Sequence, residues 1–425
     1  MLRRALLVLV TTLLVARPLV LGEDPGLTDN LSDPWGMVLT LLWLVAAAGW
    51  AVWRFWLRPT SSDKELPSRL QSAIDTPQSE NWYGGLVQTA LLATVALVFV
   101  SAEFAARYKF PARLIAWEWF GLFVTFFVMR QLAVTPAEQR GLFAVVLAGA
   151  VALSAQGIYQ QFVELPSNRR LAEDPEKLRA AATESGVQVA TEGSLEQLRR
   201  RTLENNIFGP YANPNSYASY LVLWLPGLIG AVVVCRRTGA PNWQTILAAC
   251  FAILGGAALW LTHSRGAMLG FVLAAVGVAV LIGRQRLRAH WIATLAGALL
   301  LIGLGYAVLS SDLLTTGMGK TSTTAAARLD YWPTTWRMIV ERPWLGVGPG
   351  NFRENYTRLM LPTAQEKIKD PHNFVLETWA TCGVFALLAL LVGIAAFFYQ
   401  VVRHVAVGWA DAGGPPYPSG GPPAS

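Results

Sequence analysis

Charged residues are scarce in this chain. Only 14% of its 425 residues are charged and 53% are hydrophobic, and this balance argues against a soluble fold. Short segments of alternating hydrophobicity are absent as well, which argues against an outer-membrane β-barrel. Because lipid offers the backbone no hydrogen-bonding partners, we expect the apolar stretches of this chain to be helices.

Residues for metal, redox and nucleotide chemistry are also few. The three cysteines, Cys235, Cys250 and Cys382, lie in or beside apolar stretches and form no CxxC pair, and there are four histidines, so we expect neither a disulfide framework nor a metal site. DxD, Walker A, GxSxG and HExxH motifs are absent. We therefore expect no cofactor. The net charge of +7 fits cationic loops that contact anionic membrane lipids, rather than nucleic acid.

Long apolar stretches are abundant. Most of them reach the ~20 residues that a helix needs to cross a hydrocarbon core about 30 Å thick. The sequence therefore predicts an all-α, polytopic membrane helix bundle of about ten transmembrane helices with two large extracytoplasmic loops. The ten stretches lie at roughly 5–21, 36–53, 84–101, 114–129, 141–160, 217–234, 243–261, 267–282, 291–309 and 374–400.

These stretches and the loops between them divide the chain into six segments. The first stretch follows Arg3 and Arg4 as a signal peptide would, but no small-residue cleavage site follows it, so we interpret it as a retained helix. The segments are 1–160 with membrane spans 1–5, 161–216 as an extracytoplasmic loop, 217–309 with spans 6–9, 310–373 as an extracytoplasmic catalytic loop, 374–404 as the last span and 405–425 as a disordered Gly/Pro tail.

The charges of the short loops predict the orientation of the chain. Arginine and lysine recur in alternate loops, whereas the first loop on the opposite side carries four acids and no basic residue. Positive loops stay inside, so both termini are expected in the cytoplasm and the two long loops outside. Part of 161–201 is rich in Glu, Arg, Ala and Leu, which indicates an amphipathic helix on the outer surface.

Two turns beside predicted spans carry polar residues. Asn213-Pro214-Asn215 leads into the sixth span; one asparagine can cap that helix, or both amides can face an anionic or sugar ligand. Ser264-Arg265-Gly266 lies between two spans on the outer side, where charge rules disfavour an arginine. Arg265 either binds phosphate oxygens through its planar guanidinium or is a structural arginine that reaches the membrane surface.

The segment 328–352 predicts an amphipathic helix followed by a glycine loop. Pro343 is expected to end the helix, and Arg328 lies near its start as either a solvated or a functional residue. The glycines at 346–350 do not follow a strand, which argues against a dinucleotide fold. The residues at helical spacing are Tyr331, Trp332, Thr335, Trp336 and Ile339.

Asp370-Pro371-His372-Asn373 precedes the last span. His372 is the best candidate for a general base, because an imidazole takes up and releases protons near neutral pH. A lone histidine is more often structural, but this one lies at the mouth of the predicted bundle beside arginine-rich loops. Glu377, about one turn into the span, is either a paired structural acid or part of the same site.

Together these segments resemble the O-antigen ligase and polymerase family of bacterial envelope glycan enzymes. The likeness runs from about Asn205 to Gly393 and depends on the Asn-Pro-Asn turn, the Ser-Arg-Gly turn, the Arg-x-x-Tyr-Trp helix with its ERPWLGVGPGNF sequence, and the His-Asn pair. Ligases of this family often have about twelve spans, whereas we count ten. The N-terminal half is similar only as a generic run of spans.

The resemblance implies a multi-pass enzyme of the bacterial inner membrane with its active site facing the periplasm. Such an enzyme moves a glycan from a polyprenyl diphosphate carrier to the hydroxyl of a lipid or glycan acceptor, without a metal. By motif position, Arg265 and Arg328 are expected to hold the diphosphate and His372 to act as the base. We expect further substrate contacts from Asn213, Asn215, Tyr331, Trp332, Gly348, Asn351 and Asn373.

Several other functions remain open. A polymerase that joins repeat units would share these motifs and differ in its acceptor. A glycan-lipid transporter is expected to show pseudo-symmetric halves and helices broken within the membrane, and the sequence shows no sign of either. A membrane scaffold would leave Arg265 and His372 without a role.

Overall fold

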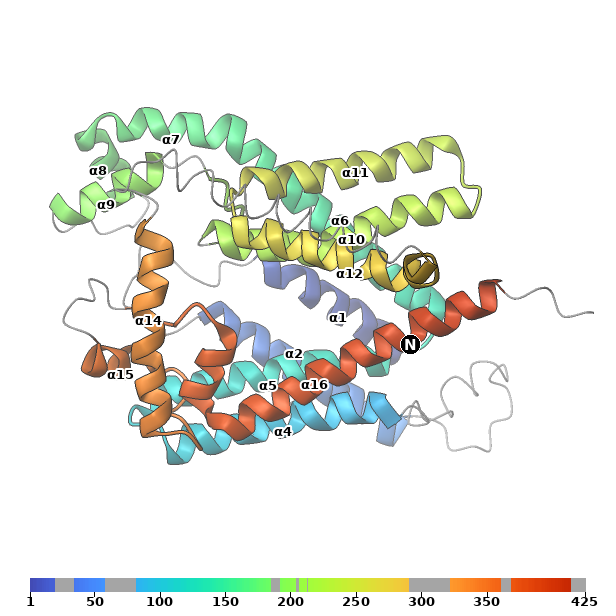
Figure 1. Cartoon of the computed structure of the whole chain (residues 1–425), viewed down its shortest axis with the longest axis horizontal. Coiled ribbons are helices and arrows are strands. Elements are labelled where there is room, and N and C mark those ends of the chain that lie inside the picture. The colour runs from blue at the N-terminus through green and yellow to red at the C-terminus, as the bar shows by residue number, and fades with distance from the viewer. Residues whose placement is uncertain are drawn as a thin grey trace, which may run out of the picture. The chain divides into compact units, whose positions relative to one another are not determined.

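The computed structural model describes residues 1–19, 34–57, 82–184, 192–203, 206–211, 213–289, 322–360 and 368–413, and in these ranges it is helical and has no strand (Figure 1). The chain forms two compact units. Unit 1 comprises Met1–Ile74 and Phe120–Ala275, and unit 2 comprises Asp75–Trp119 and Val276–Ser425.

The helices are α1 (Leu2–Leu19), α2 (Pro34–Val52) with its π-helical end η1 (Trp53–Leu57), α4 (Trp82–Phe104), α5 (Lys109–Leu132), α6 (Pro136–Tyr159), the π-helical η3 (Gln160–Glu164), α7 (Leu165–Ala172), α8 (Pro175–Glu184), α9 (Glu192–Leu203), α10 (Pro214–Arg237), α11 (Asn242–Leu261), α12 (Arg265–Ala289), α14 (Ser322–Glu341), α15 (Phe352–Leu359) and α16 (Phe374–Gly413).

Seven of the described helices are long and apolar enough to cross a membrane, which confirms the membrane-type helical fold but not the predicted count of ten spans. The first predicted span is α1, whose three arginines set it apart from the seven. The eighth is α12 (Arg265–Ala289), whose side chains are described only as far as Val278, so its role as a span stays a prediction. The ninth, 291–309, lies outside the described residues.

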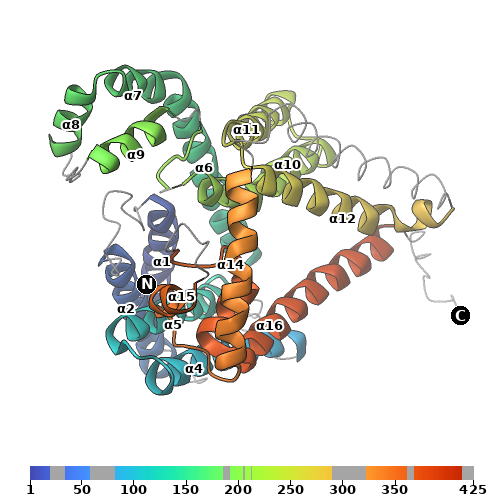
Figure 2. The same cartoon turned by 60° about the vertical axis from the view of Figure 1, so that its left-hand side comes forward.

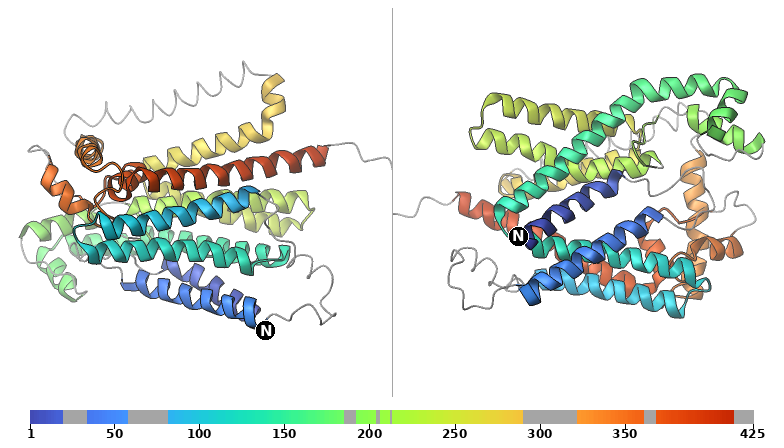
Figure 3. Two further views of the ribbon diagram at one scale, coloured as in Figure 1. Left: turned by 90° about the horizontal axis from the view of Figure 1, so that it is seen from below. Right: turned by 180° about the vertical axis from the view of Figure 1, so that it is seen from behind.

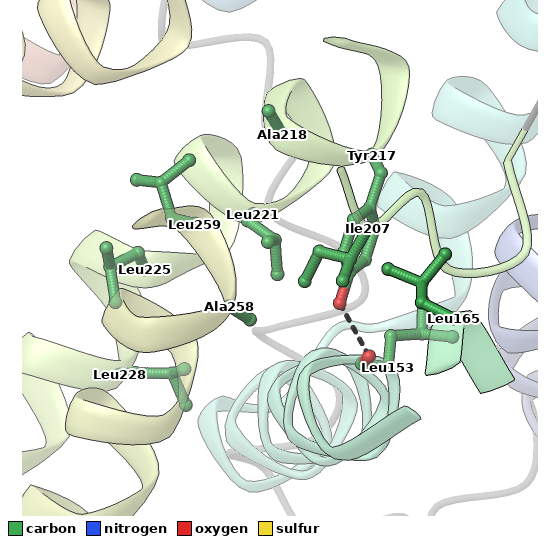
Figure 4. Packing of buried hydrophobic residues seen from close by; sticks show 10 residues of the cluster. All are labelled: Leu153, Leu165, Ile207, Tyr217, Ala218, Leu221, Leu225, Leu228, Ala258 and Leu259. Atoms are coloured by element: carbon green, nitrogen blue, oxygen red, sulfur yellow. Dashed lines mark hydrogen bonds between the residues drawn. The ribbon is translucent and has the colours of Figure 1, made fainter. Parts of the chain in front are cut away.

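The central core of unit 1 lies between α6, α10 and α11. Tyr217 is fully buried there, and its hydroxyl donates to the Leu153 carbonyl at 2.7 Å (Figure 4). Gly157, one turn further along α6, leaves room for this ring, because a Cβ at that position would overlap the Tyr217 hydroxyl. The ten residues of the core are drawn in Figure 4, and all of them belong to α6, α7, α10, α11 or the turn before α10.

A second core in unit 1 joins α1, α2 and the second half of α5 (Figure 3). The Arg3 guanidinium donates to both carboxylate oxygens of Glu138, at 2.5 and 3.0 Å, and to the Leu132 carbonyl at 2.9 Å. Glu138 also completes a capping box with Thr135 at the start of α6. One acid therefore starts α6 and fixes the first turn of α1.

The helix that begins at Pro136 is longer than the predicted fifth span. It continues through η3 and α7 to Ala172 over 37 residues, roughly 55 Å, and so exceeds a hydrocarbon core by about 25 Å. The helices α7, α8 and α9 lie together at its far end (Figure 2) around buried Ala172, Leu178 and Leu195. Much of the predicted loop 161–216 is therefore helical, in line with the amphipathic helix expected there.

Unit 2 is built on α4 and α16, which pack side by side (Figure 1). Small residues of α4, the start of α5 and α16 form one core of this unit, and α14, α15 and the first turns of α16 form the other. The last span is interrupted, because Gly383 has φ 84° and ψ 170° inside α16. At its other end, α16 extends to Gly413, beyond residue 405, where a disordered tail was expected.

Candidate functional site

The predicted amphipathic helix is α14, which ends at Glu341, just before Pro343. Tyr331, Thr335 and Ile339 lie on its buried face, whereas Trp332 and Trp336 are 39% and 51% exposed. The Trp336 ring packs edge-on against Trp379 of α16, with ring centroids 5.7 Å apart. The structure includes the backbone of Arg328 in this helix but does not describe its side chain.

The loop after α14 fills the break in α16. The amides of Val347 and Gly348 donate to the carbonyls of Ala380 and Thr381, each at 2.9 Å, and the Val384 amide donates to the Pro343 carbonyl at 3.0 Å. In an unbroken helix the Ala380 carbonyl would accept from Val384 itself. The loop therefore replaces the hydrogen bonds that the break removes.

Side chains of α4 and of the loop complete this packing. The Ser101 hydroxyl lies 2.9 Å from the Thr381 carbonyl and 2.6 Å from the Leu345 carbonyl. Asn351 is fully buried: its Oδ1 accepts from the Tyr108 amide at 2.8 Å, and its Nδ2 donates to the Tyr108 carbonyl at 3.0 Å. Gly348, with φ 94°, lies so close to Ala106 that a Cβ would overlap it.

Asn351 and Gly348 were predicted to contact substrate. In the structure the Asn351 side chain and the Gly348 backbone hold the loop in place, and both residues are buried. A role in substrate binding stays a prediction for both.

His372 lies in a tight turn before α16. Its backbone has φ 52°, a left-handed conformation that side-chain-bearing residues seldom adopt. The carboxylate oxygen Oδ1 of Asp370 lies 2.8 Å from the His372 amide nitrogen and 2.8 Å from its ring atom Nδ1. The His372 side chain is 53% exposed and that of Asp370 is 38% exposed.

Two aromatic residues of α14 support this turn. The Trp332 indole Nε1 donates to the Pro371 carbonyl at 3.3 Å, and the Tyr331 ring packs edge-on against the His372 imidazole with centroids 6.2 Å apart. The structure thus brings three of the predicted site residues, Tyr331, Trp332 and His372, together in unit 2. A fourth, Asn373, caps α16, because its Oδ1 accepts from the amides of Val375 and Leu376.

The Asp370 carboxyl titrates under the influence of His372. Burial raises its pKa, but the hydrogen bonds from the His372 side chain and amide and the charge of the imidazolium together lower the pKa below its ordinary value of 3.8. The carboxylate is therefore ionised at neutral pH and accepts hydrogen bonds only.

The Asn-Pro-Asn and Ser-Arg-Gly turns meet in unit 1. Asn213 is the N-cap of α10, and its side chain accepts from the Ser216 amide at 2.9 Å, so Asn213 is the cap of the two candidate asparagines. Asn215 accepts from the hydroxyl of buried Ser264 at 2.8 Å. Arg265, the next residue, is exposed and begins α12.

Sequence reasoning missed Gln160, which holds the chain before the Asn-Pro-Asn turn. This glutamine is 4% exposed and begins the π-helical segment η3. Its Oε1 accepts from the amides of Phe208 at 2.8 Å and Gly209 at 3.0 Å. π-bulges in long helices often lie at functional sites, but no local pattern in the sequence predicts this one.

The predicted catalytic residues are divided between the two units. Arg265 belongs to unit 1, together with Asn213 and Asn215, whereas Arg328 and His372 belong to unit 2. Within unit 2, the described contacts hold His372 by its neighbours Asp370, Tyr331 and Trp332.

Comparison with known proteins supports the resemblance inferred from the motifs. No curated protein matches the chain. Residues 250–391, about a third of the chain, match the model of a family described as O-antigen ligase. The match includes the Ser-Arg-Gly turn, α14, the glycine loop and the His-Asn pair, and leaves the Asn-Pro-Asn turn outside. Residues 250–391 are therefore similar to the O-antigen ligase family, and the described helices of this chain include seven of membrane length.

Proposed function

We propose that this protein is an integral-membrane glycosyltransferase of the bacterial inner membrane. It transfers a glycan from a polyprenyl diphosphate carrier to an acceptor hydroxyl at the periplasmic face. The observation that carries the proposal is the O-antigen ligase match, because Arg265, Arg328 and His372 all fall within the matched residues. The seven apolar helices are suited to place such an enzyme in the membrane, where a lipid-linked donor resides.

The proposed role of the two arginines is to bind the diphosphate. As the bond between the sugar and the phosphate breaks, negative charge grows on the leaving group, and fixed cations lower the energy of that state. Arg265 is the first residue of α12, where the helix dipole disfavours a positive side chain. A bound anion would remove this conflict, since it is attracted by both the guanidinium and the end of the helix.

The proposed role of His372 is to accept the proton of the acceptor hydroxyl. Its ring is about half exposed, so an acceptor can reach it, and its backbone is held by contacts on both sides. If the base acts on the face of the sugar opposite the diphosphate, the anomeric configuration is inverted.

The interruption of α16 at Gly383 favours neither a transporter nor a channel. Transporters use the backbone groups freed at such breaks to bind ions or substrates. Here the carbonyls of Ala380 and Thr381 accept from the loop amides and from Ser101 instead. The break therefore serves packing between α16 and the loop.

The test is glycan transfer by purified protein in lipid vesicles. We expect Arg265→Ala, Arg328→Ala and His372→Ala each to lower the transfer rate by on the order of 100-fold or more, while the proteins still insert and purify normally. Arg358→Ala is the matched control, because Arg358 forms an exposed ion pair with Glu341 in unit 2, worth about 0–1 kcal/mol. A wild-type transfer rate in His372→Ala would contradict the assignment of His372 as the base.

A second experiment, on the surface glycan of a strain that lacks this protein, separates a ligase from a polymerase. A deletion strain that leaves long chains on the lipid carrier indicates a ligase, and one that leaves single repeat units indicates a polymerase. Unchanged surface glycan in that strain would contradict both activities.

A further inference from the structure

Asp370 and His372 form a side-chain pair, in which only His372 has a role in the reaction proposed above. The Asp370 carboxylate is ionised and can only accept, so the ring atom Nδ1 that lies 2.8 Å from it carries a proton. In a neutral imidazole only one nitrogen carries a proton. The other nitrogen, Nε2, therefore holds the lone pair.

The backbone of the turn keeps the ring in this position. The same Asp370 oxygen that contacts Nδ1 also accepts from the His372 amide at 2.8 Å, which stabilises the left-handed conformation of φ 52°. A residue with a side chain keeps such a conformation only where the surrounding structure imposes it. The indole of Trp332 fixes the residue before it, through the Pro371 carbonyl.

We propose that Asp370 is the positioning residue of His372, and that Nε2 is the atom that accepts the proton of the acceptor hydroxyl. This inference rests on the proposed transferase function. Asp370 holds the proton on Nδ1, orients the ring and stabilises the imidazolium that forms during transfer.

The step balances as a displacement at the anomeric carbon. The acceptor O–H bond breaks as its proton passes to Nε2, and the acceptor oxygen forms the new bond to the anomeric carbon. The bond from that carbon to the diphosphate oxygen breaks, and the diphosphate leaves with the electron pair. The imidazolium then returns its proton to water, and Asp370 remains ionised throughout.

Other groups near the ring also affect its charge. Glu377, on the first turn of α16, interacts electrostatically with both Asp370 and His372, and Lys369 interacts with Asp370. Tyr331 packs against the ring from α14. Among the described contacts, the short one to Nδ1 comes from Asp370, so the substitution of Asp370 tests the pair.

Asp370→Asn is the informative variant, because its side-chain oxygen can still accept from the His372 amide and preserve the turn. It removes the negative charge and no longer dictates which ring nitrogen carries the proton. We expect the transfer rate to fall by on the order of 10- to 1,000-fold and the acid limb of the pH–rate profile to move to lower pH. Asp370→Glu should restore part of the rate.

Asp174→Asn is the matched control. Asp174 also closes a turn, through the amides of Glu176 and Lys177, but the contacts described for it involve no histidine. It should leave both the rate and the pH profile at wild-type values.

A second readout does not depend on transfer. Diethyl pyrocarbonate modifies only unprotonated imidazole, and mass spectrometry of the peptide that contains His372 follows its modification across pH in the full-length protein. We expect the midpoint to move to lower pH in Asp370→Asn. An unchanged midpoint together with an unchanged rate would overturn the pairing. A shifted midpoint with wild-type transfer in both Asp370→Asn and His372→Ala would uphold the pairing and overturn the transferase role of His372.

Discussion

Gly383→Ala is the sharpest structural perturbation that this chain offers. Gly383 has φ 84° and ψ 170°, a region of backbone space that is essentially restricted to glycine. A Cβ at this position would overlap the backbone of Trp344 and Leu345. The loop and the second half of α16 therefore cannot keep their contact if any side chain is added there.

The expected cost follows from two terms. The strained backbone conformation costs about 1–3 kcal/mol for a residue with a side chain. Displacement of the loop endangers the bonds between Val347 and Ala380 and between Gly348 and Thr381, each worth about 0.5–1.5 kcal/mol. The sum is roughly 2–6 kcal/mol, which corresponds to a fall in Tm of roughly 4–24 °C.

The assay is thermal unfolding of purified protein in detergent. The measured quantity is the fraction of protein that remains monodisperse after heating to each temperature. Gly393→Ala, in the same helix, is the control, since its Cβ would lie 3.4 Å from Ala90, an ordinary contact distance. We expect this control to keep the wild-type Tm or to exceed it, because alanine favours a helix over glycine. Equal stability of Gly383→Ala and Gly393→Ala would show that the loop does not pack into the break.

Three further predictions concern other contacts. Gln160→Leu should lower the free energy of unfolding by about 1–2 kcal/mol, because the amides of Phe208 and Gly209 lose their acceptor; thermal unfolding measures this, and an unchanged Tm refutes it. Glu138→Gln should lower the free energy of unfolding by about 1–3 kcal/mol, since Arg3 loses its charged partner. In the double variant with Arg3→Ala the two decreases should not add, and simple additivity would contradict the coupling between Arg3 and Glu138. The lowered pKa of Asp370 adds stability that is complete above the ordinary pKa of 3.8 and is lost as pH falls through the lower pKa of the folded state. As pH falls through this range, proteolysis around the turn should increase more in wild type than in Asp370→Asn. Equal increases in both proteins would contradict the contribution of Asp370 to stability.

The elements that local chemistry determines could be predicted from the sequence. Asn213 before Pro214 predicted the start of α10, and Pro343 predicted the end of α14. Both predictions were possible because a capping residue and a proline affect the helix within one turn of their own position. Seven of the ten apolar stretches predicted as spans likewise coincide with described helices of membrane length. The likeness to O-antigen ligases depended on short motifs, and the family match supports it.

The features that depend on distant partners could not be predicted. A lone glycine is common in membrane helices, so Gly383 gave no sign of a break that is filled by a loop some 35 residues upstream. The π-helical segment at Gln160 serves amides almost 50 residues away. The Asn351 side chain looked available for a ligand, yet it binds the backbone at Tyr108. Each role is created by tertiary contact and leaves no periodic pattern behind.

The two turns that carry predicted chemical groups share one design. Beside Arg265, Ser264 is bound to Asn215; beside His372, Asp370 and Asn373 bind backbone amides. In both turns the neighbours hold the backbone, while Arg265 and His372 themselves stay exposed. A reaction that depends on the position of a base and of a cation needs such rigid support, because small displacements of a reacting group are costly in rate. Substitutions of the supporting residues should therefore slow transfer without abolishing it, whereas loss of the exposed residues should abolish it.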